Sequence, residues 1–360
     1  MPDSSGEPGH MTSAATTYRA YQLLAVALLL ISLAACAAPI AGVGIRPITF
    51  PDPVNHGQTP GFVFYPSTRS THGATAIGPY DVAAGTGAPV APGTWPLVVI
   101  SHGHGGSDLG HHDLASYLAR HGFIVATFEQ PGDNFHDMSG TGHATVLAGR
   151  AIEVHAVIDA LLADPRWKPR IDPARIGVAG FSAGGYASLL VVGAQPRFAR
   201  FLGYCQSHPE DVDTCEAAKK LSPQEVASYL AELQRDFTRW GPTADPRVKA
   251  AFVMAPLALV FDAAGAEAID RPVDLWYAEN DHVLLPSANA LHLRPLVRTL
   301  VRTNAVANAD HWVFLAPCSA ALAKDAGAIC KDPPGVDRAR VHARIVADAL
   351  AFFRDALDVR

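Results

Sequence analysis

Short, continuous apolar runs alternate with longer segments of helical periodicity through the middle of the chain. The runs at 96–100, 123–128 and 176–179 are typical of strands that are buried on both faces of a parallel sheet. Residues 144–163 carry apolar side chains at helical spacing, and Pro165 indicates where this helix stops. The alternation predicts βαβ units and an α/β fold with a mostly parallel central sheet flanked by helices.

The second half of the chain continues this pattern with one interruption. Further strands are expected within 248–260 and at 273–278, and an amphipathic helix at 335–357. The polar segment 204–245 does not fit the alternation and contains a helix near 222–240. It is either a small cap inserted over the sheet or an elaborated surface helix.

The amino terminus has the pattern of an export signal. Arg19 precedes an apolar run at 23–38 that is shorter than the roughly 20 residues a membrane-spanning helix needs. We therefore predict a leader and signal peptide over 1–36, a Pro- and Gly-rich tether over 37–60, and one domain over 61–360. Met11 is an alternative start.

The end of the apolar run carries a sharper motif. Leu33-Ala34-Ala35-Cys36 resembles the lipobox of bacterial lipoproteins. The resemblance implies that Cys36 is lipidated, begins the mature chain and anchors it to a membrane in the cell envelope or periplasm. The alternative is an ordinary signal peptide with a chance cysteine.

The remaining four cysteines fall into two local pairs. Cys205 lies near Cys215, and Cys318 lies near Cys330. Neither spacing fits a zinc knuckle, and an even count in an exported chain favours disulfides. Four free thiols are the alternative.

One motif points to nucleophilic chemistry. The segment Gly180-Phe181-Ser182-Ala183-Gly184 has the form G-x-S-x-G between a predicted strand and a predicted helix. The sharp turn between them would expose the Ser182 hydroxyl at the carboxyl end of a central strand. The alternative is a small-residue crossing without a catalytic role.

A second glycine-rich loop, 102–106, follows another buried strand. Acyl transfer requires two donors aimed at the developing oxyanion. We expect these to be the backbone N–H groups of Ala183 and His104. Several histidines lie nearby in the sequence: His111, His112, His136 and His143. Their spacing fits no metal-binding motif, so we expect no metal site.

An acid and then a histidine should follow the nucleophile along the chain. Asp281 follows the strand at 273–278, and His311 comes thirty residues later. We expect His311 to take the proton from Ser182 and Asp281 to orient the imidazole. The rival acids are Asp262 and Glu279, and the rival histidines, both in predicted helices, are His292 and His342.

Four segments together carry a family resemblance: VVISHGHGGS, EQPGDNF, GVAGFSAGGY and ADHWVFLAPC. From about residue 45 to 357, the chain resembles α/β-hydrolases of the dienelactone hydrolase and platelet-activating-factor acetylhydrolase-like group. The resemblance implies an α/β-hydrolase fold and hydrolase activity. Dienelactone hydrolases use a cysteine where this chain has Ser182. The acetylhydrolases carry their catalytic acid after the strand that here reads AFVMAPLALVF. This chain has no acidic residue at that place. We therefore assign the acid to Asp281, which follows the next predicted strand.

These observations predict an exported serine hydrolase that cleaves carboxylic esters of small molecules without a cofactor. A peptidase or amidase would use the same three residues, and a non-catalytic envelope lipoprotein could retain the fold for binding.

The formal charge is only −6 and no basic cluster occurs, so a nucleic-acid partner is not expected. Nothing in the sequence implies an obligate protein partner.

The lipobox resemblance predicts a mature chain that starts at Cys36 and partitions with membranes. Intact-mass measurement of protein from its native host tests this. A mature chain that starts elsewhere and carries no lipid mass would contradict it.

Overall fold

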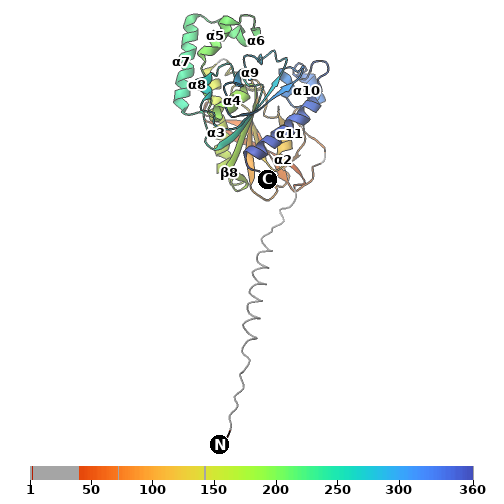
Figure 1. Cartoon of the computed structure of the whole chain (residues 1–360). Coiled ribbons are helices and arrows are strands. Elements are labelled where there is room, and N and C mark those ends of the chain that lie inside the picture. The colour runs from red at the N-terminus through yellow and green to blue at the C-terminus, as the bar shows by residue number, and fades with distance from the viewer. Residues whose placement is uncertain (1, 3–39, 72, 142, 360) are drawn as a thin grey trace. The chain divides into compact units, whose positions relative to one another are not determined.

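A sheet forms the centre of the fold (Figure 1). It has nine strands in the order β11-β10-β9-β8-β6-β7-β2-β1-β5. Strands β6 to β11 run parallel, and β2 joins β7 and β1 in antiparallel pairs. The strands of this sheet are β1 (Gly42–Asp52), β2 (Gly57–Ser67), β5 (Gly85–Thr86), β6 (Trp95–Ser101), β7 (Ile124–Phe128), β8 (Ile171–Phe181), β9 (Val248–Met254), β10 (Val273–Ala278) and β11 (Leu300–Val306). A separate two-stranded sheet pairs β3 (Thr75–Ile77) with β4 (Tyr80–Val82).

This computed structural model describes residues 2, 40–71, 73–141 and 143–359. Apart from residue 2, the predicted leader and signal peptide, with Cys36, lie outside these residues. Within the described ranges, no helix has both the length and the apolar character needed to cross a membrane.

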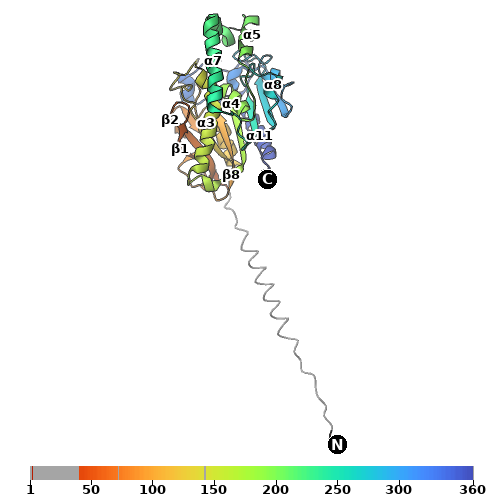
Figure 2. The ribbon, with the colours of Figure 1, turned by 90° about the vertical axis from the view of Figure 1, so that its left-hand side faces the viewer.

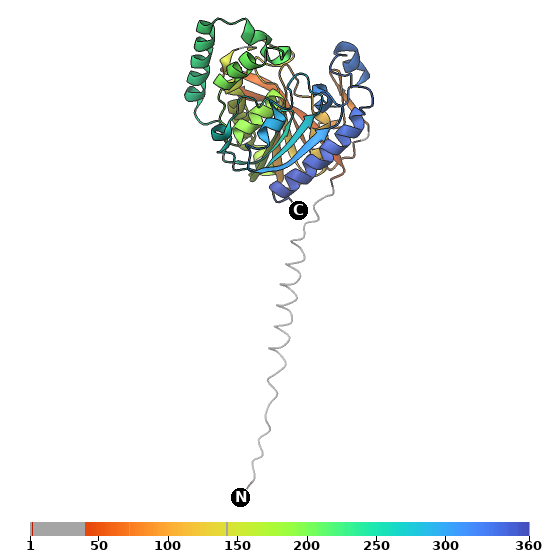
Figure 3. The ribbon, with the colours of Figure 1, turned by 45° about the horizontal axis from the view of Figure 1, so that its top comes forward.

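Helices cover both faces of the sheet (Figures 1 and 3). One face packs against α2 (His112–Arg120) and α11 (Arg338–Ala356), whose apolar side chains share a core cluster with alternate sheet residues. The other face packs against α3 (Ala144–Ala163), α4 (Ala183–Val191), α8 (Ala263–Ala266) and α9 (Ala290–Leu293). Burial from both sides explains the continuous apolar runs in β6, β7 and β8.

Three further helices fill the interruption between α4 and β9: α5 (Ala199–Ser207), α6 (Val212–Lys219) and α7 (Pro223–Trp240). Ser222 begins α7 with a capping box, in which its side chain and that of Glu225 each accept the other's backbone N–H. Helix α7 contacts α3 (Figure 2). The remaining short helices are η1 (Lys168–Arg170), η2 (His311–Phe314) and α10 (Ala320–Asp325).

The tether predicted over 37–60 is wrong from residue 42 onward. Residues 42–67 form the β1–β2 hairpin, which belongs to the sheet. Strand β1 is an edge strand over most of its length, because only Gly44 and Ile45 pair with β5. An edge strand accommodates prolines such as Pro47 and Pro51, and these gave the segment the composition of a linker.

Both predicted cysteine pairs are joined by disulfides. Cys205–Cys215 links α5 to α6, and Cys318–Cys330 brackets α10. Each closes a short loop, and a cross-link of this size stabilises a fold by about 3 kcal/mol through the lost entropy of the unfolded chain.

Peptide mapping of the exported protein without reductant should recover Cys205 joined to Cys215 and Cys318 joined to Cys330. Crossed pairs or free thiols in that map would contradict the pairing.

Candidate active site

Ser182 occupies the turn between β8 and α4. Its backbone has φ 56° and ψ −117°, a conformation that non-glycine residues rarely adopt. Such strain costs about 1–3 kcal/mol and persists only where the surroundings enforce it. Two hydrogen bonds do so: Ser182 N–H donates to the Met254 carbonyl at 2.9 Å, and Leu257 N–H donates to the Ser182 carbonyl at 3.1 Å. The turn is fixed from both sides.

The second glycine of the motif, Gly184, is required for steric reasons. A Cβ atom at Gly184 would lie 1.9 Å from the carbonyl oxygen of Ser101, at the end of β6. The first turn of α4 therefore packs directly on the neighbouring strand, which only glycine permits. The G-x-S-x-G pattern thus reflects close approach of backbone to backbone around Ser182.

Asp281 and His311 form a buried pair. The loop after β10 supplies Asp281, and η2 begins with His311. His311 Nδ1 lies 2.7 Å from Asp281 Oδ2, and both side chains are at least 98% buried. The second carboxylate oxygen, Oδ1, accepts the Leu284 N–H at 2.7 Å. This geometry orients the imidazole and leaves its Nε2 for a second partner.

The His311 ring lies next to the strained turn. Its centroid is 4.6 Å from that of Phe181, the residue directly before Ser182.

The η2 helix is supported from behind by His342 of α11, whose Nε2 lies 2.9 Å from the Val313 carbonyl. Burial alone would lower the pKa of His342, but Asp113 and this carbonyl raise it above its ordinary value.

The rival residues have other partners. The carboxylate of Asp262 caps α8 through the Gly265 N–H, and Glu279 accepts the Asn308 N–H. His292 lies 2.8 Å from the Phe261 carbonyl. The structure brings His311 together with Asp281 and with neither rival acid.

The glycine-rich loop after β6 approaches Ser182 closely. A Cβ atom at Gly103 would lie 3.2 Å from Cβ of Ser182. The following residue, His104, points its side chain away toward Asp133, with Nδ1 2.5 Å from Oδ1. Ala183 is the first residue of α4, where backbone N–H groups have no partner within the helix. Ala183 thus directly follows Ser182, and His104 directly follows the glycine that approaches it.

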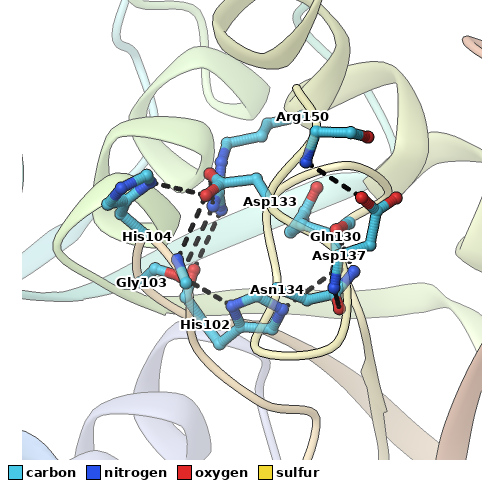
Figure 4. Close-up of polar contacts among 10 residues, drawn as sticks. His102, Gly103, His104, Gln130, Asp133, Asn134, Asp137 and Arg150 are labelled. Carbon is cyan, nitrogen blue, oxygen red and sulfur yellow. Dashed lines mark hydrogen bonds and ion pairs between the residues drawn. The ribbon is translucent and has the colours of Figure 1, made fainter. Parts of the chain in front are cut away.

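A buried arginine holds this loop in place (Figure 4). Arg150 of α3 is 1% exposed and donates from Nη1 to the His102 carbonyl at 2.9 Å and from Nη2 to the Gly103 carbonyl at 3.4 Å. Its Nη2 also pairs with Asp133. One guanidinium therefore joins the glycine-rich loop to the loop after β7.

Asp133 is the centre of this cluster. It pairs with Arg150 and His104 and accepts the Gly105 N–H at 3.1 Å. Burial alone would raise the pKa of Asp133, but the hydrogen bond from His104 and the charge of Arg150 hold it well below the ordinary value. The carboxylate stays ionised and fixes both loops.

Sequence reasoning missed the role of Arg150, although the helical pattern contains a signal for it. Arg150 lies three residues after Leu147 and four before Val154, on the predicted apolar stripe of α3. A charge on a buried stripe is rare unless it is paired. The segment EQPGDNF contains Asp133, but its local pattern gives no sign of the pairing with Arg150.

A polar cavity of about 530 Å³ lies beside this cluster, between the β1–β2 hairpin and the loop after β7. Its lining includes Glu129, His136 and the buried Glu153, but none of Ser182, Asp281 or His311. Burial raises the pKa of Glu153 well above its ordinary value. His136 pairs with Glu129 at 2.9 Å, and no group of His, Cys, Asp or Glu in the described part of the chain is arranged to hold a metal ion.

Comparisons with known proteins support the fold. A scan of known protein families finds no match, and a search of curated proteins finds none. Among solved structures, the chain is similar to a ferulic acid esterase from Streptomyces cinnamoneus, with a TM-score of 0.55 and 22% identity over 90% of this chain and 93% of that one. The predicted fold is confirmed: the chain has an α/β-hydrolase fold. The narrower resemblance to the dienelactone hydrolase group stays a prediction.

The Arg150–Asp133 pair makes a prediction for stability. Asp133→Asn leaves a buried guanidinium without its counter-charge and should lower the free energy of unfolding by roughly 3 kcal/mol at pH 7. Because the pairing depresses the pKa of Asp133, its contribution is full above the ordinary value near 4 and is lost as the pH falls toward the folded-state value. Denaturant unfolding at pH 7, 5 and 3 should show a difference that shrinks only at pH 3.

Asp137→Asn is the matched control, because this aspartate lies exposed on the same loop, where its Oδ1 accepts the Ser139 N–H at 2.9 Å. A loss as small as that of the control, or one unchanged at pH 3, would contradict the role given to Asp133.

Proposed function

We propose that this protein is a serine hydrolase of carboxylic esters, with Ser182, His311 and Asp281 as its catalytic triad. The observation that carries the proposal is the strained turn at Ser182 beside the buried His311–Asp281 pair. The structural neighbour described as a ferulic acid esterase supports the choice of an ester bond.

The chemistry follows from what each group can do. His311 Nε2 takes the proton from Ser182 Oγ, which attacks the ester carbonyl carbon and forms a tetrahedral intermediate. The N–H groups of Ala183 and His104 stabilise its oxyanion. The intermediate collapses, His311 returns the proton to the leaving alcohol, and water hydrolyses the acyl-enzyme by the same steps.

Asp281 acts through His311. Its carboxylate holds the Nδ1–H tautomer, so that Nε2 faces the nucleophile, and it stabilises the imidazolium that forms during attack. Arg150 is a positioning residue, because it fixes the carbonyls of His102 and Gly103 and thereby the loop that carries the His104 N–H.

The peptidase or amidase alternative uses the same groups against a poorer leaving group, and relative rates on matched ester and amide substrates distinguish the two. The disulfides are consistent with an exported protein. Anchoring through Cys36 remains part of the proposal.

The triad makes a graded prediction for kcat on a p-nitrophenyl ester. Ser182→Ala and His311→Ala should each remove nearly all activity, because nucleophile and base act as one unit. Asp281→Asn should lower kcat by about 10⁴-fold, since the wrong tautomer is then held.

Asp262→Asn and Glu279→Gln are the matched controls and should retain most of the activity. A large loss of kcat in either control, together with an active Asp281→Asn variant, would show that Asp281 is not the catalytic acid. An active Ser182→Ala variant would refute the serine mechanism.

A further inference from the structure

An apolar cavity of about 590 Å³ lies between α3, α5 and α7. Leu147 of α3, Phe198 at the start of α5, Phe201 within it and Tyr229 of α7 contribute to its lining. Its volume is within the range of small-molecule sites, which are mostly apolar.

The cavity shares one lining residue, Leu257, with the hydrogen bonds that fix the Ser182 turn. Leu257, which lines it, donates its backbone N–H to the Ser182 carbonyl at 3.1 Å. The same inserted helices also reach the loop of the acid, because Thr214 Oγ1 of α6 lies 3.5 Å from the Val283 carbonyl, two residues after Asp281. The Cys205–Cys215 disulfide ties α5 to α6. The insertion therefore contacts the loops that carry or support the triad.

We propose that this cavity binds the acyl group of the ester, and that the preferred substrates carry a medium-chain or aryl acyl group; this rests on the function proposed above. The acyl group stays bonded to Ser182 after the alcohol leaves, so a cavity lined by Leu257, which is itself bonded to the Ser182 carbonyl, suits it. Among the described residues, no Lys, Arg or His lines the cavity, so an anionic group would find no counter-charge there, whereas the mostly apolar side chains of the lining suit a neutral apolar group.

A series of p-nitrophenyl esters tests the acyl preference on the protein with its two disulfides intact. Burial of each added methylene can raise kcat/KM by up to about fourfold. We expect kcat/KM for the octanoate, kept below its micelle concentration, to exceed that for the acetate by at least tenfold. A kcat/KM that falls from acetate to octanoate would overturn the proposal.

A variant that fills the cavity locates the effect. Ser228 lines the cavity on α7, and Ala231, one turn later, is exposed and outside the lining. Ser228→Trp should lower kcat/KM for the octanoate at least tenfold and leave that for the acetate within twofold. Ala231→Trp, the matched control, should change neither.

The outcomes separate this proposal from the function it rests on. If the protein hydrolyses the acetate but Ser228→Trp does not change kcat/KM for the octanoate, the acyl-binding role of the cavity is overturned and the hydrolase function is kept. An effect of Ser228→Trp on octyl acetate, but not on the octanoate, assigns the cavity to the alcohol and also overturns it. No hydrolysis of any ester refutes the hydrolase itself.

Discussion

The candidate site depends on one strained turn. Ser182 has a positive φ, and the hydrogen bonds to Met254 and from Leu257 hold it there. The turn places Ser182 directly before the first residue of α4. The sheet holds the backbone in this strained conformation, because β8 is a central strand that pairs with β6 on one side and β9 on the other.

The groups around the turn are held by buried ion pairs contributed by the helices. Arg150 of α3 fixes the glycine-rich loop from one face of the sheet, and His342 of α11 supports η2 and hence His311 from the other. A site of this kind needs groups held within a fraction of an ångström, and paired charges that are shielded from water provide such rigidity. The two helices thus link the packing of the core to the geometry of the site.

The sequence predicted the layers and the sheet because buried strands and amphipathic helices leave strong local patterns. It also placed Asp281 in the loop after a strand and selected His311 by the order of acid and then histidine along the chain. It could not reveal that Arg150 reaches the His102 carbonyl, because that contact depends on tertiary packing. It misjudged 42–60, because proline and glycine occur both in linkers and in edge hairpins such as β1–β2.

Labelling with a fluorophosphonate probe tests the central claim most directly, because the probe reacts with a serine only where a base and an oxyanion site activate it. The folded protein should gain a single adduct, mapped by peptide mass to Ser182, and His311→Ala should abolish the labelling while circular dichroism shows the fold intact. An unlabelled Ser182 in the folded protein, or equal labelling of the His311→Ala variant, would contradict the account.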